Sequence, residues 1–473
     1  MDRLIDEALL QWKNSKDRKP MVLYGARQVG KTHSIMEFGT KHYASVAYFY
    51  FDNNPDLCEL FENGVSSIKS LTIKLEAYAN ETIHPGKTLI VLDEVQTCGA
   101  ALNSLKLYQE TAPEYHIIAV GSLLGIALNR KGYSFPVGKV DELCMFPLTF
   151  KEFLMEFYPK LIPLIREGYD NNTPLGAGLH NQALELFLQY LVIGGMPEVI
   201  MEYRKTNNYT MVRAKQLSIC NNYISDMNKY TDTKTQAIRN EAAYNTLPSQ
   251  LARENRKFQY AKIKSGARAN DYELSLNWLE KASLIIKCNK VSEGKEPLAN
   301  YEDFLSFKVY MSDIGLYCAK SNNSYISVLG RTMGDTAKGA LTENYVAQQL
   351  YANGIKFYYW ESSSRAELDF VVQVENSIIP IEVKSWEAVR SQSLEVFQKK
   401  YNIKNAIRVS ARNFGYENGI KSVPLYAVWC IDNSYFNALP EKRNLMEAKT
   451  INEDIEMKKE IVPIPHQASG GNI

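Results

Sequence analysis

The eight residues with the clearest chemical meaning are Gly25, Ala26, Arg27, Gln28, Val29, Gly30, Lys31 and Thr32. They fit the pattern G-x-x-x-x-G-K-[ST], a glycine-rich loop whose backbone N–H groups point at phosphate. The apolar run 19–24 predicts a strand before the loop, and the run 33–38 predicts a helix whose N-terminus adds positive charge. We therefore expect ATP to bind these eight residues, with Lys31 on the β- and γ-phosphates and Thr32 on Mg²⁺.

Two acids follow a second apolar run, residues 88–92. In phosphate-loop ATPases we expect such a strand beside the loop strand, with Asp93 holding Mg²⁺ through water and Glu94 polarising the attacking water. The alternative is a solvated strand end. Ser122 follows the next apolar strand, where it either senses the γ-phosphate or is a plain loop serine. Arg27 is interpreted as a surface residue rather than a catalytic one.

A third group of polar residues lies near the C-terminus, where two strand-like runs carry Asp369, Glu382 and Lys384. Because residues two apart in a strand share a face, Glu382 and Lys384 point the same way. Asp369 should meet them across the strand pair. Upstream, Glu343 lies on one side of a helix-like run. The alternative is that these alternating charges form a solvated face.

The order of these elements predicts an α/β protein of several domains. Residues 1–155 alternate buried strands with helices, which favours a parallel sheet covered on both faces and a nucleotide-binding domain. Residues 156–235 predict a helical lid, and 326–440 predict a further α/β unit. Residues 236–325 read as three helices and two strands, similar to a winged helix. Residues 441–473 form a tail whose end we expect to fray.

Composition restricts the possible partners. The chain has 473 residues, 45% hydrophobic and 23% charged, with a net charge of +1, so any nucleic-acid site must be a local patch. Seven dispersed cysteines without a C-x-x-C pair, beside six histidines, favour free thiols in a reducing cytoplasm over structural zinc. We expect no signal peptide and no membrane span.

Basic residues are spaced through the winged-helix candidate. They form a plausible stripe of phosphate contacts for DNA, although winged helices also serve as protein-interaction modules. The six residues are Arg253, Arg256, Lys257, Lys262, Lys264 and Arg268.

Together these motifs resemble the AAA+ class, specifically the bacterial and archaeal family whose ATPase core is joined to a DUF4143 region. The resemblance implies an AAA+ core that uses ATP and Mg²⁺ and a possible homo-oligomer, either a ring or a smaller assembly. Family members carry an arginine where this chain has Lys139, a point charge instead of a planar fork. Arg130 is the other candidate for that role. Further shared segments are 121–122, 146–153, 194–198 and 311–316.

The C-terminal residues resemble the PD-(D/E)XK nuclease fold. That resemblance implies that Asp369 and Glu382 bind one or two Mg²⁺ ions and that Glu343 completes the metal shell. It also implies that Lys384 orients or helps to deprotonate the attacking water. Because fold does not imply function, nuclease activity stays an open question.

Three functions compete. The first is an ATPase coupled to nucleic-acid binding or processing. The alternative is an ATP-regulated switch or scaffold whose nuclease-like domain is an inactive protein-interaction module. A metabolic phosphate-loop kinase is disfavoured because the chain is long and lacks an obvious lid over a small substrate.

Overall fold

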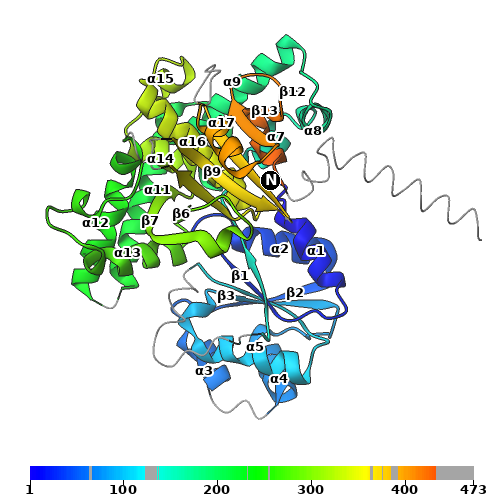
Figure 1. Ribbon diagram of the computed structural model, residues 1–473. Coiled ribbons are helices and arrows are strands. Elements are labelled where there is room, and N and C mark those ends of the chain that lie inside the picture. The colour runs from blue at the N-terminus through cyan, green and yellow to red at the C-terminus, as the bar shows by residue number, and fades with distance from the viewer. Residues whose placement is uncertain are drawn as a thin grey trace, which may run out of the picture.

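The computed structural model describes residues 1–62, 67–122, 136, 138–231, 233–253, 256–362, 366–374, 376–384 and 392–432 (Figure 1). Arg130 and the tail 441–473 lie outside them. Two sheets, connected by helices, make up this part of the chain. None of its helices is by itself long and apolar enough to cross a membrane, although one bent pair, Ala177–Ile193 with Pro197–Thr206, passes that test by length and composition.

The N-terminal sheet has five strands, all parallel, as predicted. Residues that alternate along its strands face two different cores. One face packs on α1 (Ile5–Asn14) and α2 (Lys31–His42), and the other on α3 (Pro55–Glu62), α4 (Ile68–Ala79) and α5 (Gly99–Thr111) (Figure 1). In order across the sheet, the strands are β2 (Ser45–Tyr50), β3 (Thr88–Asp93), β4 (His116–Val120), β1 (Met21–Tyr24) and β5 (Asp141–Cys144).

The position of β3 corrects one prediction. β3, which ends at Asp93, does not lie beside the loop strand β1, because β4 separates the two. Every residue of β4 is buried, as a strand between two neighbours inside a covered sheet requires. The carboxyl ends of parallel strands still meet at one edge, so the residues after β1, β3 and β4 remain neighbours.

A layer of helices follows the first sheet. Residues 156–235 are mostly helical, and their buried side chains share one core with α1, α2 and the second sheet. The helices that lie in or begin before this range are α7 (Phe150–Phe157), α8 (Leu161–Asn171), α9 (Ala177–Ile193), α10 (Pro197–Thr206) and α11 (Tyr209–Lys229). Further along the chain follow α12 (Lys234–Leu251), α13 (Ala269–Lys281), α14 (Ile314–Lys320) and α15 (Tyr325–Leu329).

The second sheet has eight strands and joins two predicted domains. β6 (Ile285–Val291) and β7 (Glu302–Met311) are antiparallel and correspond to the two strands predicted in the winged-helix candidate. Among the described residues of that region, only two α-helices, α12 and α13, precede them, where three were predicted. However, β6 also pairs in parallel with β8 (Phe357–Glu361), so the boundary placed at 325/326 crosses a continuous sheet. The remaining strands are β9 (Glu367–Val374), β10 (Ser377–Val383), β11 (Ala406–Ser410), β12 (Gly415–Glu417) and β13 (Ile420–Pro424), with helices α16 (Asp335–Ala352) and α17 (Gln392–Tyr401) beside them.

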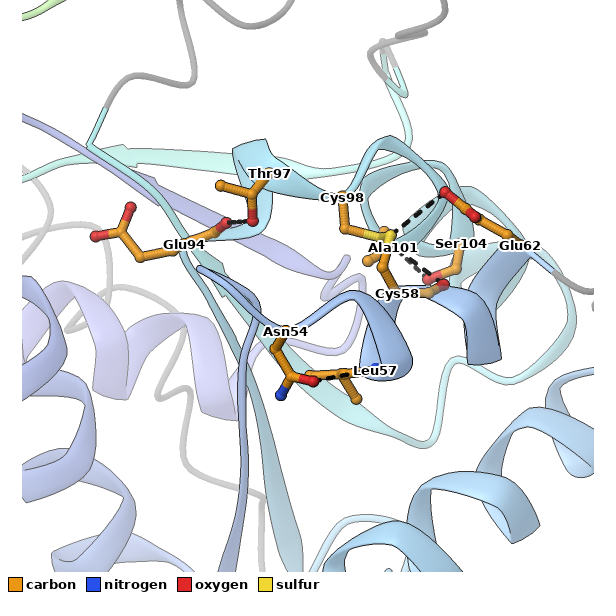
Figure 2. The surroundings of a disulfide bond; sticks show 9 residues. All are labelled: Asn54, Leu57, Cys58, Glu62, Glu94, Thr97, Cys98, Ala101 and Ser104. Atoms are coloured by element: carbon orange, nitrogen blue, oxygen red, sulfur yellow. Dashed lines mark hydrogen bonds between the residues drawn. A yellow bond between two sulfur atoms is a disulfide. The ribbon is translucent and has the colours of Figure 1, made fainter. Parts of the chain in front are cut away.

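The expectation of seven free thiols is wrong for one pair. Cys58 and Cys98 form a disulfide that ties α3 to the start of α5 (Figure 2). The two residues are 40 positions apart, and only the packing of α3 on α5 brings them together. The other five cysteines are free.

Candidate nucleotide site and C-terminal carboxylate cluster

The predicted phosphate loop connects β1 to α2, in the strand–loop–helix context that its sequence requires. Two of its glycines have backbone conformations that side chains disfavour. Gly25 has φ +145°, and a Cβ there would lie 2.1 Å from the carbonyl oxygen of Met145. Gly30 caps α2 with φ +95°. The loop therefore needs both glycines to place its N–H groups at the N-terminus of the helix.

Lys31 lies inside this loop. Its Nζ donates hydrogen bonds to the carbonyl oxygens of Gly25 at 3.1 Å and Ala26 at 2.8 Å. Burial lowers the pKa of Lys31 to about 8, although the carboxylates of Glu94 and Asp93 act in the opposite direction. The ammonium is thus close to the predicted phosphate position and has only carbonyl oxygens as hydrogen-bond partners.

The two predicted Mg²⁺ ligands of this site lie together. The Oγ1 of Thr32 donates to Oδ2 of Asp93 at 2.7 Å, across the gap between α2 and β3. Tyr48 of β2 donates its hydroxyl to the same oxygen at 2.8 Å, and the Glu94 N–H donates to Oδ1 at 2.9 Å. A hydroxyl beside a buried carboxylate fits a hard cation such as Mg²⁺. No local pattern in the sequence indicates that Tyr48 contacts Asp93.

Glu94 and Ser122 follow the ends of β3 and β4, at the edge of the sheet that carries the loop. Glu94 has φ +53°, a left-handed conformation uncommon for a residue with a side chain. The Nε2 of Gln96 donates to its carboxylate. Ser122 is buried just beyond β4. Both positions are compatible with the predicted roles near the γ-phosphate.

Arg27 is more than a surface residue, because its side chain and its carbonyl oxygen both contact α11. Its guanidinium forms an ion pair with Asp226 of α11. Tyr223, one turn earlier on α11, donates its hydroxyl to the Arg27 carbonyl oxygen at 2.9 Å. On the other side of the loop, Arg3 donates to the carbonyl oxygen of Val29 at 2.8 Å. Two regions far apart in the sequence therefore hold the loop, and local sequence patterns could not reveal either.

Lys139, the residue at the expected arginine-finger position, pairs with a glutamate of α5. Lys139 forms an ion pair with Glu110 of α5 at 3.0 Å. Both side chains are more than a third exposed, so this pair is weak. Arg130 falls outside the described residues.

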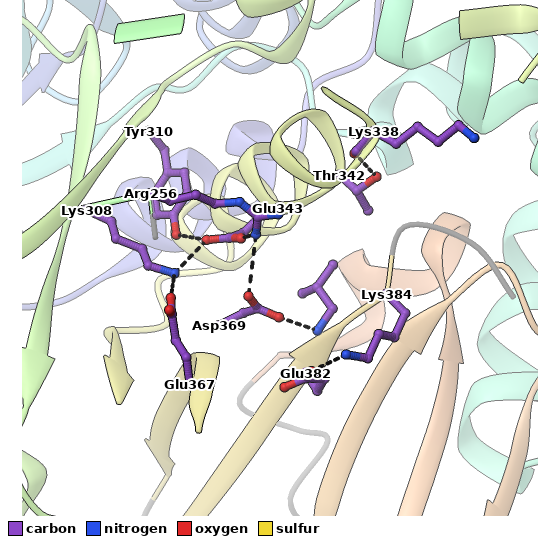
Figure 3. Close-up of polar contacts among 11 residues, drawn as sticks. Arg256, Lys308, Tyr310, Lys338, Thr342, Glu343, Glu367, Asp369, Glu382 and Lys384 are labelled. Atoms are coloured by element: carbon purple, nitrogen blue, oxygen red, sulfur yellow. Dashed lines mark hydrogen bonds and ion pairs between the residues drawn. The ribbon is translucent and has the colours of Figure 1, made fainter. Parts of the chain in front are cut away.

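Figure 3 shows where Glu343, Asp369, Glu382 and Lys384, the four residues of the C-terminal constellation, lie. β9 and β10 are antiparallel neighbours, and Oδ2 of Asp369 accepts the Val383 N–H at 2.8 Å. Lys384 forms an ion pair with Glu382. Glu343 faces them from α16 and is completely buried. We call Glu343, Glu367, Asp369 and Glu382 the carboxylate cluster.

Basic side chains neutralise most of this cluster, which the sequence argument did not anticipate. The guanidinium of Arg256 forms ion pairs with Glu343 and, at 3.6 Å, with Asp369 (Figure 3). The buried Nζ of Lys308 lies 3.0 Å from Glu343 and 2.6 Å from Glu367. Tyr310 donates its hydroxyl to Glu343 at 2.5 Å.

This arrangement does not fit the implied Mg²⁺ ions. Arg256 contacts two of the three predicted ligands, Glu343 and Asp369. Within the described ranges, no group of three or more His, Cys, Asp or Glu side chains is arranged to hold a metal ion. Glu382, the third predicted ligand, pairs with Lys384 instead of Arg256, and its Oε2 is buried without a hydrogen-bond partner. Burial and then the nearby Asp369 raise the pKa of Glu382 to about 7, while Lys384 opposes the shift.

Two residues of the predicted basic stripe form ion pairs with carboxylates of the same chain. Arg256 enters the carboxylate cluster, and Lys257 forms an ion pair with Glu361 of β8. Lys262, Lys264 and Arg268 remain exposed. The surface left for phosphate contacts is therefore smaller than the sequence indicates.

Three family models match the chain. They describe an AAA domain at residues 17–154, a domain of unknown function (DUF8612) at 184–326 and a domain of unknown function (DUF4143) at 338–428. No curated protein sequence matches. These matches agree with the resemblance to AAA+ proteins with a DUF4143 region. The descriptions of the matching families name neither a winged helix nor a nuclease.

Several solved structures are distantly similar. The Aeropyrum pernix ORC2 protein, solved as ADPNP–ADP complexes, is 12% identical, with 70% of this chain and 94% of that chain covered and a TM-score of 0.33. The ORC1 protein of the same organism, in complex with DNA, is 13% identical, with 70% and 92% covered and a TM-score of 0.25. CDC6P from Pyrobaculum aerophilum is 10% identical, with 70% and 93% covered and a TM-score of 0.24. Similarity at this level does not bear on ligands. By its sequence matches, the chain carries an AAA domain at residues 17–154 and a C-terminal DUF4143 domain at residues 338–428.

Proposed function

We propose that the chain binds ATP with Mg²⁺ at the loop of residues 25–32 and hydrolyses it. The contact between Thr32 and Asp93 supports the proposal most, because Oγ1 of Thr32 and Oδ2 of Asp93 lie 2.7 Å apart and both residue types suit Mg²⁺. The buried Lys31 supports it, since an ammonium beside a glycine-rich loop at a helix N-terminus is suited to phosphate.

Each residue has a distinct part in this proposal. Lys31 exchanges its carbonyl partners for phosphate oxygens, and Thr32 and Asp93 hold the metal ion. Mg²⁺, when bound, neutralises charge that develops on the phosphates. Glu94, just past the strand end, accepts a proton from the attacking water, and Ser122 contacts the γ-phosphate from the end of β4.

We further propose that the nucleotide state is transmitted to the rest of the chain through α11. Arg27 and the backbone of the loop are both bound to this helix, by Asp226 and Tyr223 respectively. α11 in turn packs against α12 and α14. These contacts, from the loop to α11 and from α11 to α12 and α14, favour the interpretation that the protein is an ATP-regulated switch. Coupling to nucleic acid is the companion proposal, which rests on the exposed Lys262, Lys264 and Arg268.

ATP turnover with Mg²⁺ tests the central proposal. Lys31→Ala should abolish nucleotide binding, whereas Glu94→Gln should retain binding and lower kcat by about 10²- to 10⁴-fold. Lys41→Ala is the matched control, because this exposed lysine of α2 pairs only with Glu37 one turn away, and it should leave turnover unchanged. Unchanged ATP turnover by the Lys31→Ala protein would contradict the proposal.

Double-stranded DNA separates the two companion proposals. Stimulation of turnover by DNA at low salt, lost when Lys262, Lys264 and Arg268 are changed to alanine, supports coupling to nucleic acid. Turnover that ignores DNA, together with ATP-dependent changes in amide exchange of α11 or in molecular mass, supports the switch. The mass measurement also tests the predicted homo-oligomer.

A further inference from the structure

Arg256 comes from outside the domain whose carboxylates it contacts. It lies between α12 and β6, within the region matched by DUF8612, whereas Glu343 and Asp369 belong to the DUF4143 region. The next two residues fasten it to the edge strand β7. Lys257 forms a β-bridge with Lys308, and the Phe258 N–H donates to the Phe307 carbonyl oxygen at 3.0 Å. We call residues 256–258 the strap.

The backbone at Arg256 is unusual. Its φ is +43°, in the left-handed region that residues with side chains seldom adopt. Such a conformation persists when surrounding contacts hold it, and these outliers gather at switches and ligand sites. Here the contacts that hold it are the pairing of the strap with β7 and the ion pairs with Glu343 and Asp369.

Helix α16 leaves space for the guanidinium. A Cβ at Gly339 would lie 2.4 Å from Nη2 of Arg256. Gly339 precedes Glu343 by four residues, so both face the same side of the helix. Glycine is a poor residue for a helix interior, and the close approach of Arg256 explains its presence at this position.

We propose that Arg256 occupies the cation position of the carboxylate cluster, so that the docked strap closes Glu343 and Asp369 to divalent metal ions and withdrawal of the strap opens them. A guanidinium and a metal ion cannot share the same carboxylate oxygens, because both are positive and both require direct contact. The strap is therefore an internal inhibitor of any metal-dependent chemistry at this cluster. The proposal rests on contacts of the C-terminal sheet and is independent of ATP.

Mn²⁺ binding to the nucleotide-free protein, followed by electron paramagnetic resonance, tests this directly. The experiment uses the full chain with Asp93→Asn, so that the N-terminal site does not contribute. With the strap intact, no Mn²⁺ should bind the cluster. Arg256→Gln should add about one Mn²⁺ per chain, and a further Asp369→Ala change should remove it.

Gly339→Ala is the second variant, and it keeps the arginine. Its methyl group would lie 2.4 Å from Nη2, the flexible end of the Arg256 side chain, so the guanidinium must shift and its contacts with the carboxylates should weaken, which should give the additional Mn²⁺ site with a lower affinity than in Arg256→Gln. This variant keeps the proposal testable if Arg256→Gln fails to fold, because alanine favours the helix more than glycine does. Lys257→Gln is the matched control, since its ion pair goes to Glu361, outside the cluster, and it should add no Mn²⁺.

Two results would overturn the proposal. One is Mn²⁺ binding by the parent protein that disappears with Asp369→Ala, since metal and guanidinium would then coexist. The other is the absence of additional Mn²⁺ in folded Arg256→Gln protein with an unchanged circular dichroism spectrum or, if that variant does not fold, in folded Gly339→Ala protein.

Discussion

The nucleotide site and the carboxylate cluster differ in the partners of their charged side chains. At the phosphate loop, Asp93 accepts hydrogen bonds from two hydroxyl groups and a backbone N–H, and Lys31 binds only carbonyl oxygens. At the carboxylate cluster, Glu343 contacts both Arg256 and Lys308. The first site leaves its charges available to a ligand, whereas the second satisfies them within the chain.

This difference shows why similar residues support different conclusions. Carboxylates beside basic residues are compatible with catalysis at either site. Only the partners of each charge distinguish a site that awaits a ligand from one that holds the fold together. We therefore expect stability to depend on the C-terminal charges and ligand response to depend on the N-terminal ones.

The largest expected effect tests the C-terminal half of this comparison. Lys308→Met removes a fully buried ammonium that contacts Glu343 and Glu367. Because breaking one partner of a buried ion pair leaves the other uncompensated, the free energy of unfolding should fall by about 3–5 kcal/mol. The shift of the urea midpoint measures this change.

Lys356→Met is the matched control for that prediction. Lys356 pairs with Glu302 in the same sheet region, but its side chain is 66% exposed, so the loss should stay below about 1 kcal/mol. Equal effects of the two substitutions would mean that the carboxylate cluster does not stabilise the fold.

The next largest effect tests the N-terminal half. Asp93→Asn should change the stability of the ligand-free protein by less than about 1 kcal/mol, because the amide oxygen can still accept the Glu94 N–H and the amide NH2 can donate to the hydroxyls of Thr32 and Tyr48, which accept as well as donate. Mg·ATP at about 100 times its Kd should stabilise the unaltered protein by about 2.7 kcal/mol. Asp93→Asn should lose most of that stabilisation, and thermal unfolding with and without Mg·ATP measures it. A full Mg²⁺-dependent shift in the variant would contradict the assignment of Asp93 as a metal ligand.

Local sequence patterns predicted the helices, strands and loop that carry both sites. They did not predict the strand order or the distant residues around the sites. The loop, the strand ending at Asp93 and the β9–β10 pair each depend on residues close in sequence, so periodicity and motif spacing were sufficient. The strand order was not predictable in this way, because β4 enters between β1 and β3 through packing of the whole sheet. For the same reason the β6–β8 pairing crossed a predicted domain boundary.

The partners of the charges were the least predictable part. Asp226 lies 199 residues from Arg27, and nothing in a helix sequence indicates which of its acids meets a distant loop. Arg256 was assigned to a DNA-binding stripe because it lies among other basic residues. Its actual position follows from a left-handed backbone and a glycine on α16, neither of which periodicity can reveal.

A smaller effect would sharpen the description of the nucleotide site. Tyr48→Phe removes the hydroxyl that donates to Asp93 at 2.8 Å. A hydrogen bond to a charged group contributes about 1.5–3 kcal/mol when buried. Tyr48 is 38% exposed, so we expect about 1 kcal/mol, or about fivefold weaker Mg·ATP binding by calorimetry. Tyr50→Phe is the control on the same strand face: Tyr50 is the backbone partner of Asp93 in the β2–β3 pairing, whereas the hydroxyl that donates to the Asp93 carboxylate belongs to Tyr48, so removal of the Tyr50 hydroxyl should have little effect. An equal loss in both variants would assign the change to strand packing.

The smallest effect concerns the protonation of Lys31. Burial lowers its pKa to about 8 in the ligand-free protein. Phosphate contact should raise that pKa, so the bound state holds a proton that part of the free protein lacks, and ATP binding takes up protons near and above pH 8. The Kd should therefore rise about twofold from pH 7 to 8 and by up to about tenfold per unit beyond that. Calorimetry in two buffers of different ionisation enthalpy measures the uptake directly. Binding that ignores pH in this range would mean that carbonyl oxygens already hold Lys31 fully charged, and the two sites would then differ less than their partners indicate.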